Sequence, residues 1–118
     1  MCIEQQVAGA SPRQLIAMLY GRAVRDLEGA SELFALKEDP RAQADAIHLI
    51  VHAQQIIAEL NTCLNKDGGD LAVNLARIYE YMQYRLTEAV SSLDANAVAE
   101  ICGLLAELRD TWNLVAEQ

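Results

Sequence analysis

No stretch of this 118-residue sequence approaches the ~20 consecutive apolar residues of a membrane-spanning helix, although 53% of its residues are hydrophobic. The first ten residues are too short for a signal peptide and lack its basic start. We therefore expect no membrane insertion. A chain of this length is expected to form one domain that is long enough to bury a real core.

Cysteine and positive charge are also scarce. The three cysteines (Cys2, Cys63 and Cys102) are odd in number, far apart and without a CxxC pair. This usage favours reduced thiols and a cytoplasmic location. The net charge is −8, and acidic residues repel the phosphates of nucleic acids and anionic lipids. Neither nucleic acid nor a membrane surface is therefore expected as a partner.

Motifs that carry catalytic or cofactor chemistry are missing, since the sequence has no P-loop, no GxGxxG and no zinc-ligand spacing. Asp45, His48 and His52, spaced i, i+3 and i+7, loosely resemble the carboxylate-x-x-His pattern of di-metal bundles. Such sites need a second motif and further inward carboxylates, which the sequence does not supply. We expect no metal, no cofactor and no enzyme. A bundle that binds a metal or small ligand through these three residues remains an alternative.

Helix-start signals divide the chain into four helices. Ser11, followed by Pro12 and then by Gln14 at the third helical position, has the form of a capping box. Asp39 stands before a second proline, and Asp94 precedes the last apolar run, so both are expected N-caps. The only glycine pair of the sequence lies at 68–69 and predicts a turn.

These signals predict an all-α fold, an antiparallel up-down four-helix bundle with a short extra segment at its N-terminus. Short links between helices of this length favour antiparallel neighbours. The predicted core face of the third helix comprises Leu71, Leu75, Ile78, Met82, Leu86 and Ala89. The expected ranges are an arm at 1–10, a short helix or cap, and a bundle at 11–118 with helices at about 12–36, 40–65, 70–91 and 95–116.

The second helix carries more apolar surface than one core can use. A bundle helix needs one apolar stripe, which here comprises Leu49, Ile50, Ala53, Ile56, Ile57, Leu60 and Leu64. We call the second set the surplus stripe; it comprises Ala44, Ile47, Val51 and Ala58. Another element or a partner must cover this stripe, and a self-associating structural bundle would do so with a second copy.

Four segments, in this order, resemble the signatures of the FliS family of flagellar export chaperones. Each segment consists mostly of helix-forming residues, but their order and spacing together are specific. The resemblance covers residues 11 to about 113. The segments are Ser11-Pro12 with Leu15–Tyr20, Ala53–Asn61, Gly68-Gly69 with Asn74-Leu75 and Tyr79–Met82, and Glu107–Trp112.

The resemblance implies an antiparallel helical bundle in the cytosol that binds the disordered C-terminal region of flagellin. Such a chaperone prevents early polymerisation and keeps flagellin competent for flagellar type III secretion, with the export apparatus as a further partner. From the surplus stripe, we expect a monomer or homodimer when no flagellin is bound. In the family a short N-terminal segment can cover a groove. The arm of this chain lacks the usual tyrosine, but Ile3 and Val7 could form an apolar plug.

The expected flagellin contacts come from two sources. Positions that match the family pattern are Gln54, Ile57, Asn61, Leu71, Asn74, Leu75, Tyr79 and Met82. The surplus stripe adds Ile47, Val51 and Ala58. Core packing explains Ile57, Leu71 and Leu75 equally well. The two sets lie on different surfaces, so the sequence leaves open which surface binds a partner.

Overall fold

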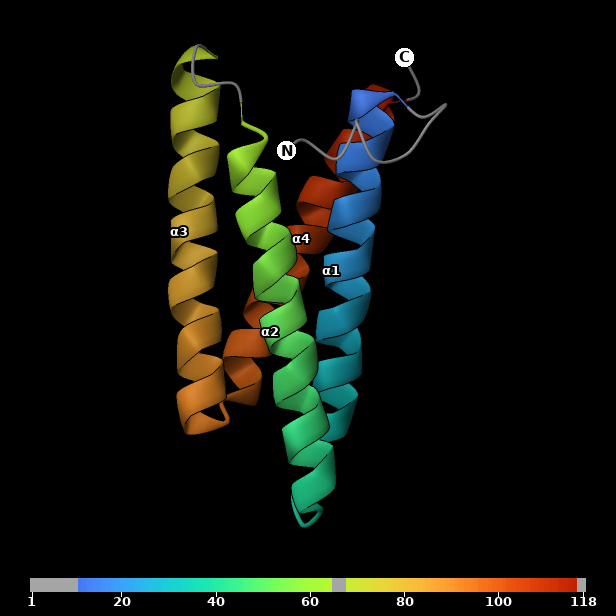
Figure 1. Cartoon of the computed structure of the whole chain (residues 1–118), viewed down its shortest axis with the longest axis vertical. Coiled ribbons are helices and arrows are strands. Elements are labelled where there is room, and N and C mark those ends of the chain that lie inside the picture. Colours follow the sequence, from blue (N-terminus) through green and yellow to red (C-terminus); the bar gives the residue numbers. More distant parts are fainter. Residues whose placement is uncertain (1–10, 65–67, 117–118) are drawn as a thin grey trace.

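The computed structural model describes residues 11–64 and 68–116, and these residues form an all-α, up-down four-helix bundle (Figure 1). The predicted fold class is confirmed. Each helix packs against its neighbours in sequence, and α1 also packs against α4. The predicted arm, with Ile3 and Val7, lies outside the described residues. The helices are α1 (Pro12–Phe34), α2 (Pro40–Thr62), α3 (Gly69–Ser92) and α4 (Ala95–Ala116).

The predicted caps start three of the helices. Ser11 Oγ accepts a hydrogen bond from the Gln14 backbone N–H at 3.1 Å, and Gln14 Oε1 accepts from the Ser11 N–H at 2.9 Å. Asp39 and Asp94 each accept two backbone N–H bonds at the starts of α2 and α4. These caps satisfy donors that the first helical turn leaves unpaired. Local side-chain chemistry therefore fixes where these helices begin.

The helix ends deviate slightly from expectation. α1 ends at Phe34 rather than 36, and α2 ends at Thr62 rather than 65. α3 extends one residue further at each end, and α4 has its predicted bounds. Leu93 ends α3 in the left-handed region at φ 52°. Among the described residues, no helix is both long and apolar enough to cross a membrane.

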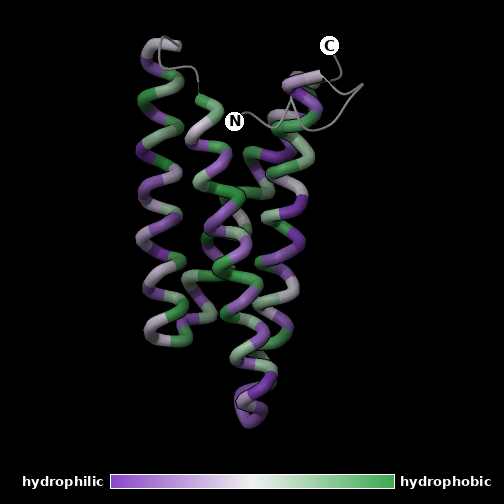
Figure 2. Tube along the Cα trace, in the orientation of Figure 1, coloured by the Kyte–Doolittle hydropathy of each residue, from purple (hydrophilic) through white to green (hydrophobic). Residues whose placement is uncertain are grey.

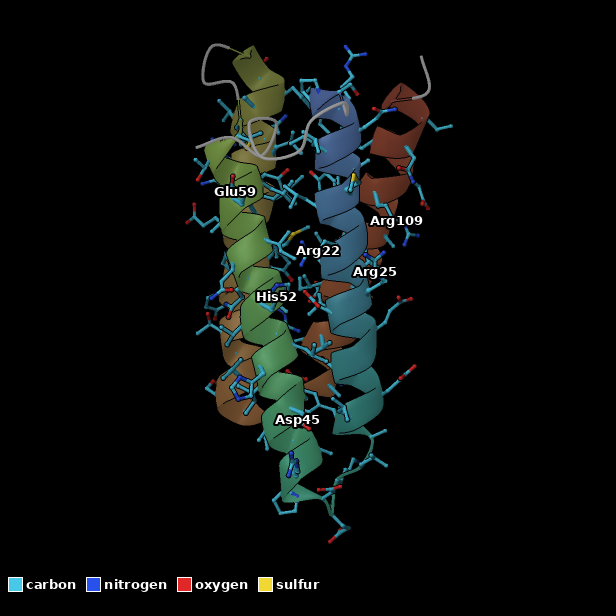
Figure 3. The ribbon with its side chains drawn as sticks, turned by 45° about the vertical axis from the view of Figure 1, so that its right-hand side comes forward. Arg22, Arg25, Asp45, His52, Glu59 and Arg109 are labelled. Carbon is cyan, nitrogen blue, oxygen red and sulfur yellow. The ribbon has the colours of Figure 1, made fainter. Side chains whose placement is uncertain are left out.

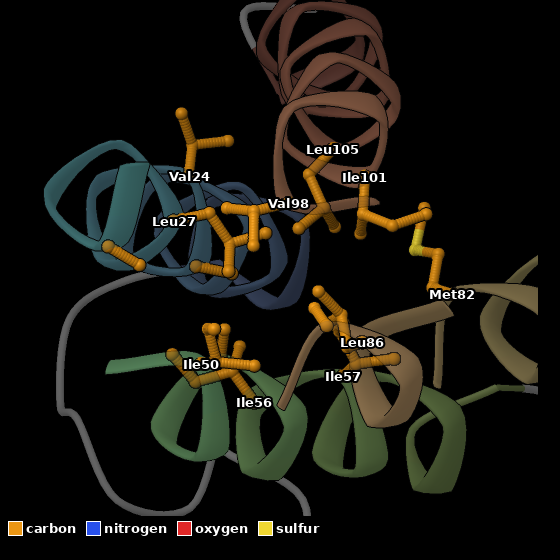
Figure 4. Close-up of a cluster of buried hydrophobic side chains, with 14 of the residues drawn as sticks. Val24, Leu27, Ile50, Ile56, Ile57, Met82, Leu86, Val98, Ile101 and Leu105 are labelled. Atoms are coloured by element: carbon orange, nitrogen blue, oxygen red, sulfur yellow. The ribbon is translucent and has the colours of Figure 1, made fainter. Parts of the chain in front are cut away.

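The core is a continuous apolar cluster to which all four helices contribute (Figure 4). Among the described residues, no polar or charged residue other than tyrosine is classed as buried. Hydrophobic positions recur along each helix (Figure 2). The largest fully buried side chains are Tyr20, Leu15, Leu27, Ile50, Ile57, Leu60, Met82, Leu86, Ile101, Leu105, Val24 and Val98.

The helix α3 is packed less extensively than the others. The interfaces of α1 with α2 and with α4 are much more extensive than those of α3 with either of its neighbours. Figure 1 shows α3 along the side of the bundle. The predicted core face of α3 is therefore wrong at two positions: Leu71 is 67% exposed and Ile78 is 37% exposed. Tyr79 turns inward instead and is 3% exposed.

The surplus stripe lies on the outer face of α2. Ala44, Val51 and Ala58 are exposed, and Ile47 is partly buried. Val51 is 40% exposed, which makes it the largest open side chain of the stripe. This placement agrees with the prediction that α2 carries more apolar surface than its core contact requires.

Candidate functional site

An apolar cleft opens at the end of the bundle where α1 and α3 begin and α2 and α4 end. We call it the end cleft; its volume is about 230 Å³. It forms where the start of α3 leaves Leu71 exposed. Its lining comes from all four helices and comprises Ile16, Leu60, Cys63, Leu64, Gly68, Leu71, Ala72, Leu75, Tyr79 and Trp112.

A pair of buried tyrosines underlies the end cleft. Tyr20 is fully buried on α1, and its hydroxyl is hydrogen-bonded to the hydroxyl of Tyr79 on α3. The Trp112 ring stacks on Tyr20, with ring centroids 6.4 Å apart and an interplanar angle of 23°. Burial raises the pKa of both tyrosines above the ordinary value. Because both hydroxyls stay neutral, the tyrosine pair forms a rigid, uncharged floor.

A second hollow, the α3–α4 groove, runs between these two helices and has a volume of about 330 Å³. Ile78 and Tyr81 line it from α3, and Leu104 and Leu108 line it from α4. Two opposite charges complete the lining, Arg77 on α3 and Glu107 on α4.

The two hollows lie next to each other along α3 and α4. Ile78 of the groove lies about one turn from Leu75 of the end cleft, and Leu108 lies about one turn from Trp112. Together they form an apolar surface that follows α3 and α4 toward the middle of the bundle.

A charged network closes the α3–α4 seam beyond the groove. Arg85 Nε donates to Glu100 Oε1 at 2.8 Å, and its guanidinium also pairs with Glu88 at 2.9 Å. The Tyr81 hydroxyl donates to Glu100 Oε2 at 2.5 Å. The Tyr81 bond, and then Arg85, hold the pKa of Glu100 below its usual value. The groove therefore ends where side chains join α3 to α4.

Comparison with known families identifies the chain. A family model described as "Flagellar protein FliS" matches residues 2–118.

The chain belongs to the FliS family.

Curated relatives carry the corresponding name. The flagellar secretion chaperone FliSB of Pseudomonas aeruginosa is 37% identical over 112 residues, which cover 94% of this chain and 86% of the relative. The flagellar secretion chaperone FliS of Salmonella typhimurium is 35% identical over 115 residues (97% and 83%). That of Bacillus subtilis is 30% identical over 109 residues (92% and 78%). The resemblance to FliS is thus confirmed, and the chain belongs to a family of chaperones rather than enzymes.

The FliS-derived contact positions divide into three groups in the structure. Ile57 and Met82 are fully buried in the core, so a partner could touch them only if the bundle opened. Leu71, Leu75 and Tyr79 come together in the end cleft, and Leu71 is 67% exposed there.

The three polar positions among these contacts lie outside the end cleft. Asn61 and Asn74 are exposed next to cleft-lining residues in the sequence, without lining the cleft themselves. Gln54 joins α2 to α3 by two hydrogen bonds. Its side-chain amide donates to Thr87 Oγ1 at 3.2 Å, and its backbone carbonyl accepts from Gln83 Nε2 at 2.9 Å. This pattern gives Gln54 a structural contact within the bundle.

The surplus-stripe positions are separate from the two hollows. Ile47, Val51 and Ala58 line neither the end cleft nor the α3–α4 groove. The flagellin contacts expected from the sequence therefore fall on two separate surfaces, the surplus stripe and the end cleft with Leu71, Leu75 and Tyr79.

Sequence reasoning missed the α4 wall of this surface and the groove residues of α3. Trp112 and Leu108 fit the ordinary inward face of the last helix, so nothing marked them as accessible. Ile78 and Tyr81 line the groove instead of the core or open solvent. Apolar residues at 78 and 81, about one turn apart, lie on one side of the third helix and could have indicated the groove.

The proposed metal-ligand residues do not form a site. Asp45 and His48 are exposed, whereas His52 faces α1 and its Nδ1 lies 2.5 Å from Asp26 Oδ2 (Figure 3). Within residues 11–64 and 68–116, no group of three or more His, Cys, Asp or Glu side chains is placed to hold a metal ion. The metal-binding alternative therefore receives no support.

Proposed function

We propose that this FliS-family chain is a cytoplasmic export chaperone for flagellin. It binds the disordered C-terminal region of flagellin, prevents early polymerisation and keeps the subunit ready for the flagellar type III export apparatus. The observation that supports this most directly is the pair of neighbouring apolar hollows, the end cleft and the α3–α4 groove.

A disordered segment that folds on binding must recover its ordering entropy through a long, mostly apolar contact. The two hollows supply such a contact, because together they extend along α3 and α4 and are lined largely by Leu, Ile and aromatic side chains. An amphipathic helix placed in such a groove buries its apolar face while its polar face stays in water. Masking of flagellin in this way needs one chaperone per subunit and no chemical step.

The N-terminal arm is proposed to cover the end cleft when flagellin is absent. Ile16 lines the cleft about one turn into α1, so the residues that precede Ser11 attach close to its rim. Ile3 and Val7 would place two apolar side chains over it. Replacement of both by serine should tighten flagellin binding, and calorimetry that shows unchanged or weaker binding would contradict this role.

The direct test of the function is titration with a peptide from the C-terminal region of flagellin of the same organism. We expect a 1:1 complex, measured by calorimetry and light scattering, and a gain of helical circular dichroism beyond the sum of the components. Trp112 is the only tryptophan of the chain and lines the end cleft, so its fluorescence should change on binding. No heat and no helix gain at tens of micromolar would reject the proposal. A mass that increases with protein concentration alone would favour the self-associating bundle.

A further inference from the structure

Arg77 and Glu107 face each other across the α3–α4 groove, in the same arrangement as a nearby Arg–Glu ion pair between these two helices. Arg85 and Glu100 join α3 to α4 at 2.8 Å. Arg77 lies eight residues before Arg85, and Glu107 lies seven residues after Glu100. In an antiparallel helix pair these steps, each about two turns, place Arg77 opposite Glu107.

Arg77 and Glu107 do not form an ion pair with each other. Both residues line the groove and are exposed, and among the described residues neither forms an ion pair. The side chains of Ile78, Leu104 and Leu108 lie between the two walls. The groove thus presents an apolar floor with a positive charge on its α3 side and a negative charge on its α4 side.

We propose that Arg77 and Glu107 select the direction in which a partner helix lies in the α3–α4 groove. The occupant is an amphipathic helix with an acidic residue on the flank that meets Arg77 and a basic residue on the flank that meets Glu107. If such a helix is reversed end to end with its apolar face kept on the groove, its two flanks exchange sides. Like charges then face each other, so one direction is favoured.

The inference deepens the proposed function and rests on it, because the occupant is taken to be a helical segment of flagellin. Charge complementarity carries the choice of occupant, because flanking residues of opposite sign are attracted to the two rim charges, whereas neutral flanks are not. In addition, Leu108 of the groove lies about one turn from Trp112 of the end cleft, so the direction of the segment decides which of its ends lies near the cleft.

The first experiment measures binding of the flagellin C-terminal peptide to Arg77→Glu and to Glu107→Arg. Each single reversal should weaken binding about three- to tenfold, with a larger loss at low salt, as for rim charges of an interface. Arg25→Glu and Glu32→Arg are matched controls with the same charge changes on α1, and both residues are exposed and outside the two hollows. Circular dichroism checks that each variant is folded.

The second experiment measures direction. A peptide without tryptophan carries an acceptor dye at its N-terminus or at its C-terminus, and energy transfer from Trp112 reports which end lies near the end cleft. In the wild-type protein, one labelled peptide should give clearly stronger transfer than the other. In the double variant Arg77→Glu/Glu107→Arg this order should reverse.

The inference is overturned if both reversals act like their controls and the double variant keeps the wild-type order of transfer. In that result the peptide still binds, so the proposed function stands. Absence of peptide binding to the wild-type protein overturns both. A concentration-dependent mass that both single reversals abolish would assign the groove to a second copy of the chain and overturn the inference as well.

Discussion

Replacement of the tyrosines beneath the end cleft, singly and together, should reveal a strong coupling. Tyr20 lies on α1 and Tyr79 on α3, and their hydroxyl groups are hydrogen-bonded to each other. Tyr20 is 0% exposed and Tyr79 is 3% exposed. Tyr20→Phe leaves the buried Tyr79 hydroxyl without this partner. An unsatisfied buried polar group costs about 1–3 kcal/mol, so we expect a loss of about 2 kcal/mol in unfolding free energy.

The second single variant should cost about as much. Tyr79→Phe leaves the fully buried Tyr20 hydroxyl without its hydrogen-bond partner, so a loss of about 2 kcal/mol is again expected. The double variant Tyr20→Phe/Tyr79→Phe removes both hydroxyls of the pair. Its cost should therefore be at least about 1 kcal/mol smaller than the sum of the single costs.

Urea unfolding followed by far-ultraviolet circular dichroism measures all three values. Additive costs would refute the reasoning, because they would show that the two hydroxyls reach water or other partners. Val24, which is also fully buried on α1 but apolar, provides a control. The unfolding free energy lost in Val24→Ala should be the same in the wild-type protein and in the Tyr79→Phe variant.

Three further changes test other features of the fold. Leu93→Gly should raise the thermal midpoint, since Leu93 ends α3 at φ 52° and relief of a left-handed conformation in a non-glycine residue is worth about 1 kcal/mol; an unchanged or lower midpoint would contradict this. Gly103→Ala should gain about 0.5–1 kcal/mol in urea unfolding, because the added methyl group meets open space within α4, and a loss would show an unseen contact. At alkaline pH, the raised pKa values of the tyrosine pair contribute stability that is fully present below the unfolded pKa of about 10 and is lost as pH rises above it. Urea titrations across this range should show the decline, and the double phenylalanine variant should decline less.

The local features of this fold could be predicted from sequence because they depend on neighbouring residues. Ser11, Asp39 and Asp94 cap helices by hydrogen bonds within the first turn, so the helix starts follow from sequence spacing alone. The order of the helices and their antiparallel arrangement follow from the short links. Periodicity also identified the buried stripe of α2, including Ile50 and Ile57.

The packing of α3 could not be predicted in the same way. Hydrophobic period shows which side chains share a face, but it does not show how closely two helices approach. Leu71 and Ile78 belong to the predicted core face of α3 but are exposed to solvent, because α3 packs less extensively on its neighbours. The tyrosine pair depends on a contact between residues 59 positions apart.

The binding surface was only partly predictable for the same reason. Its residues come from all four helices, and Trp112 has the sequence pattern of an ordinary core residue. The family resemblance indicated Leu71, Leu75 and Tyr79, which do meet in the end cleft. The surplus stripe of α2 was identified correctly as apolar, but its exposure does not show that a partner covers it.

Calorimetric titration of the flagellin C-terminal peptide into two glutamate variants tests most directly whether flagellin binds at the end cleft. Leu71 and Val51 are 67% and 40% exposed, so glutamate at either position should leave the bundle folded. Leu71→Glu places a charge in the end cleft and should weaken binding at least about tenfold, whereas Val51→Glu, on the surplus stripe, should leave affinity nearly unchanged. A loss for Val51→Glu that equals or exceeds the loss for Leu71→Glu would contradict this account and place the flagellin site on the outer face of α2.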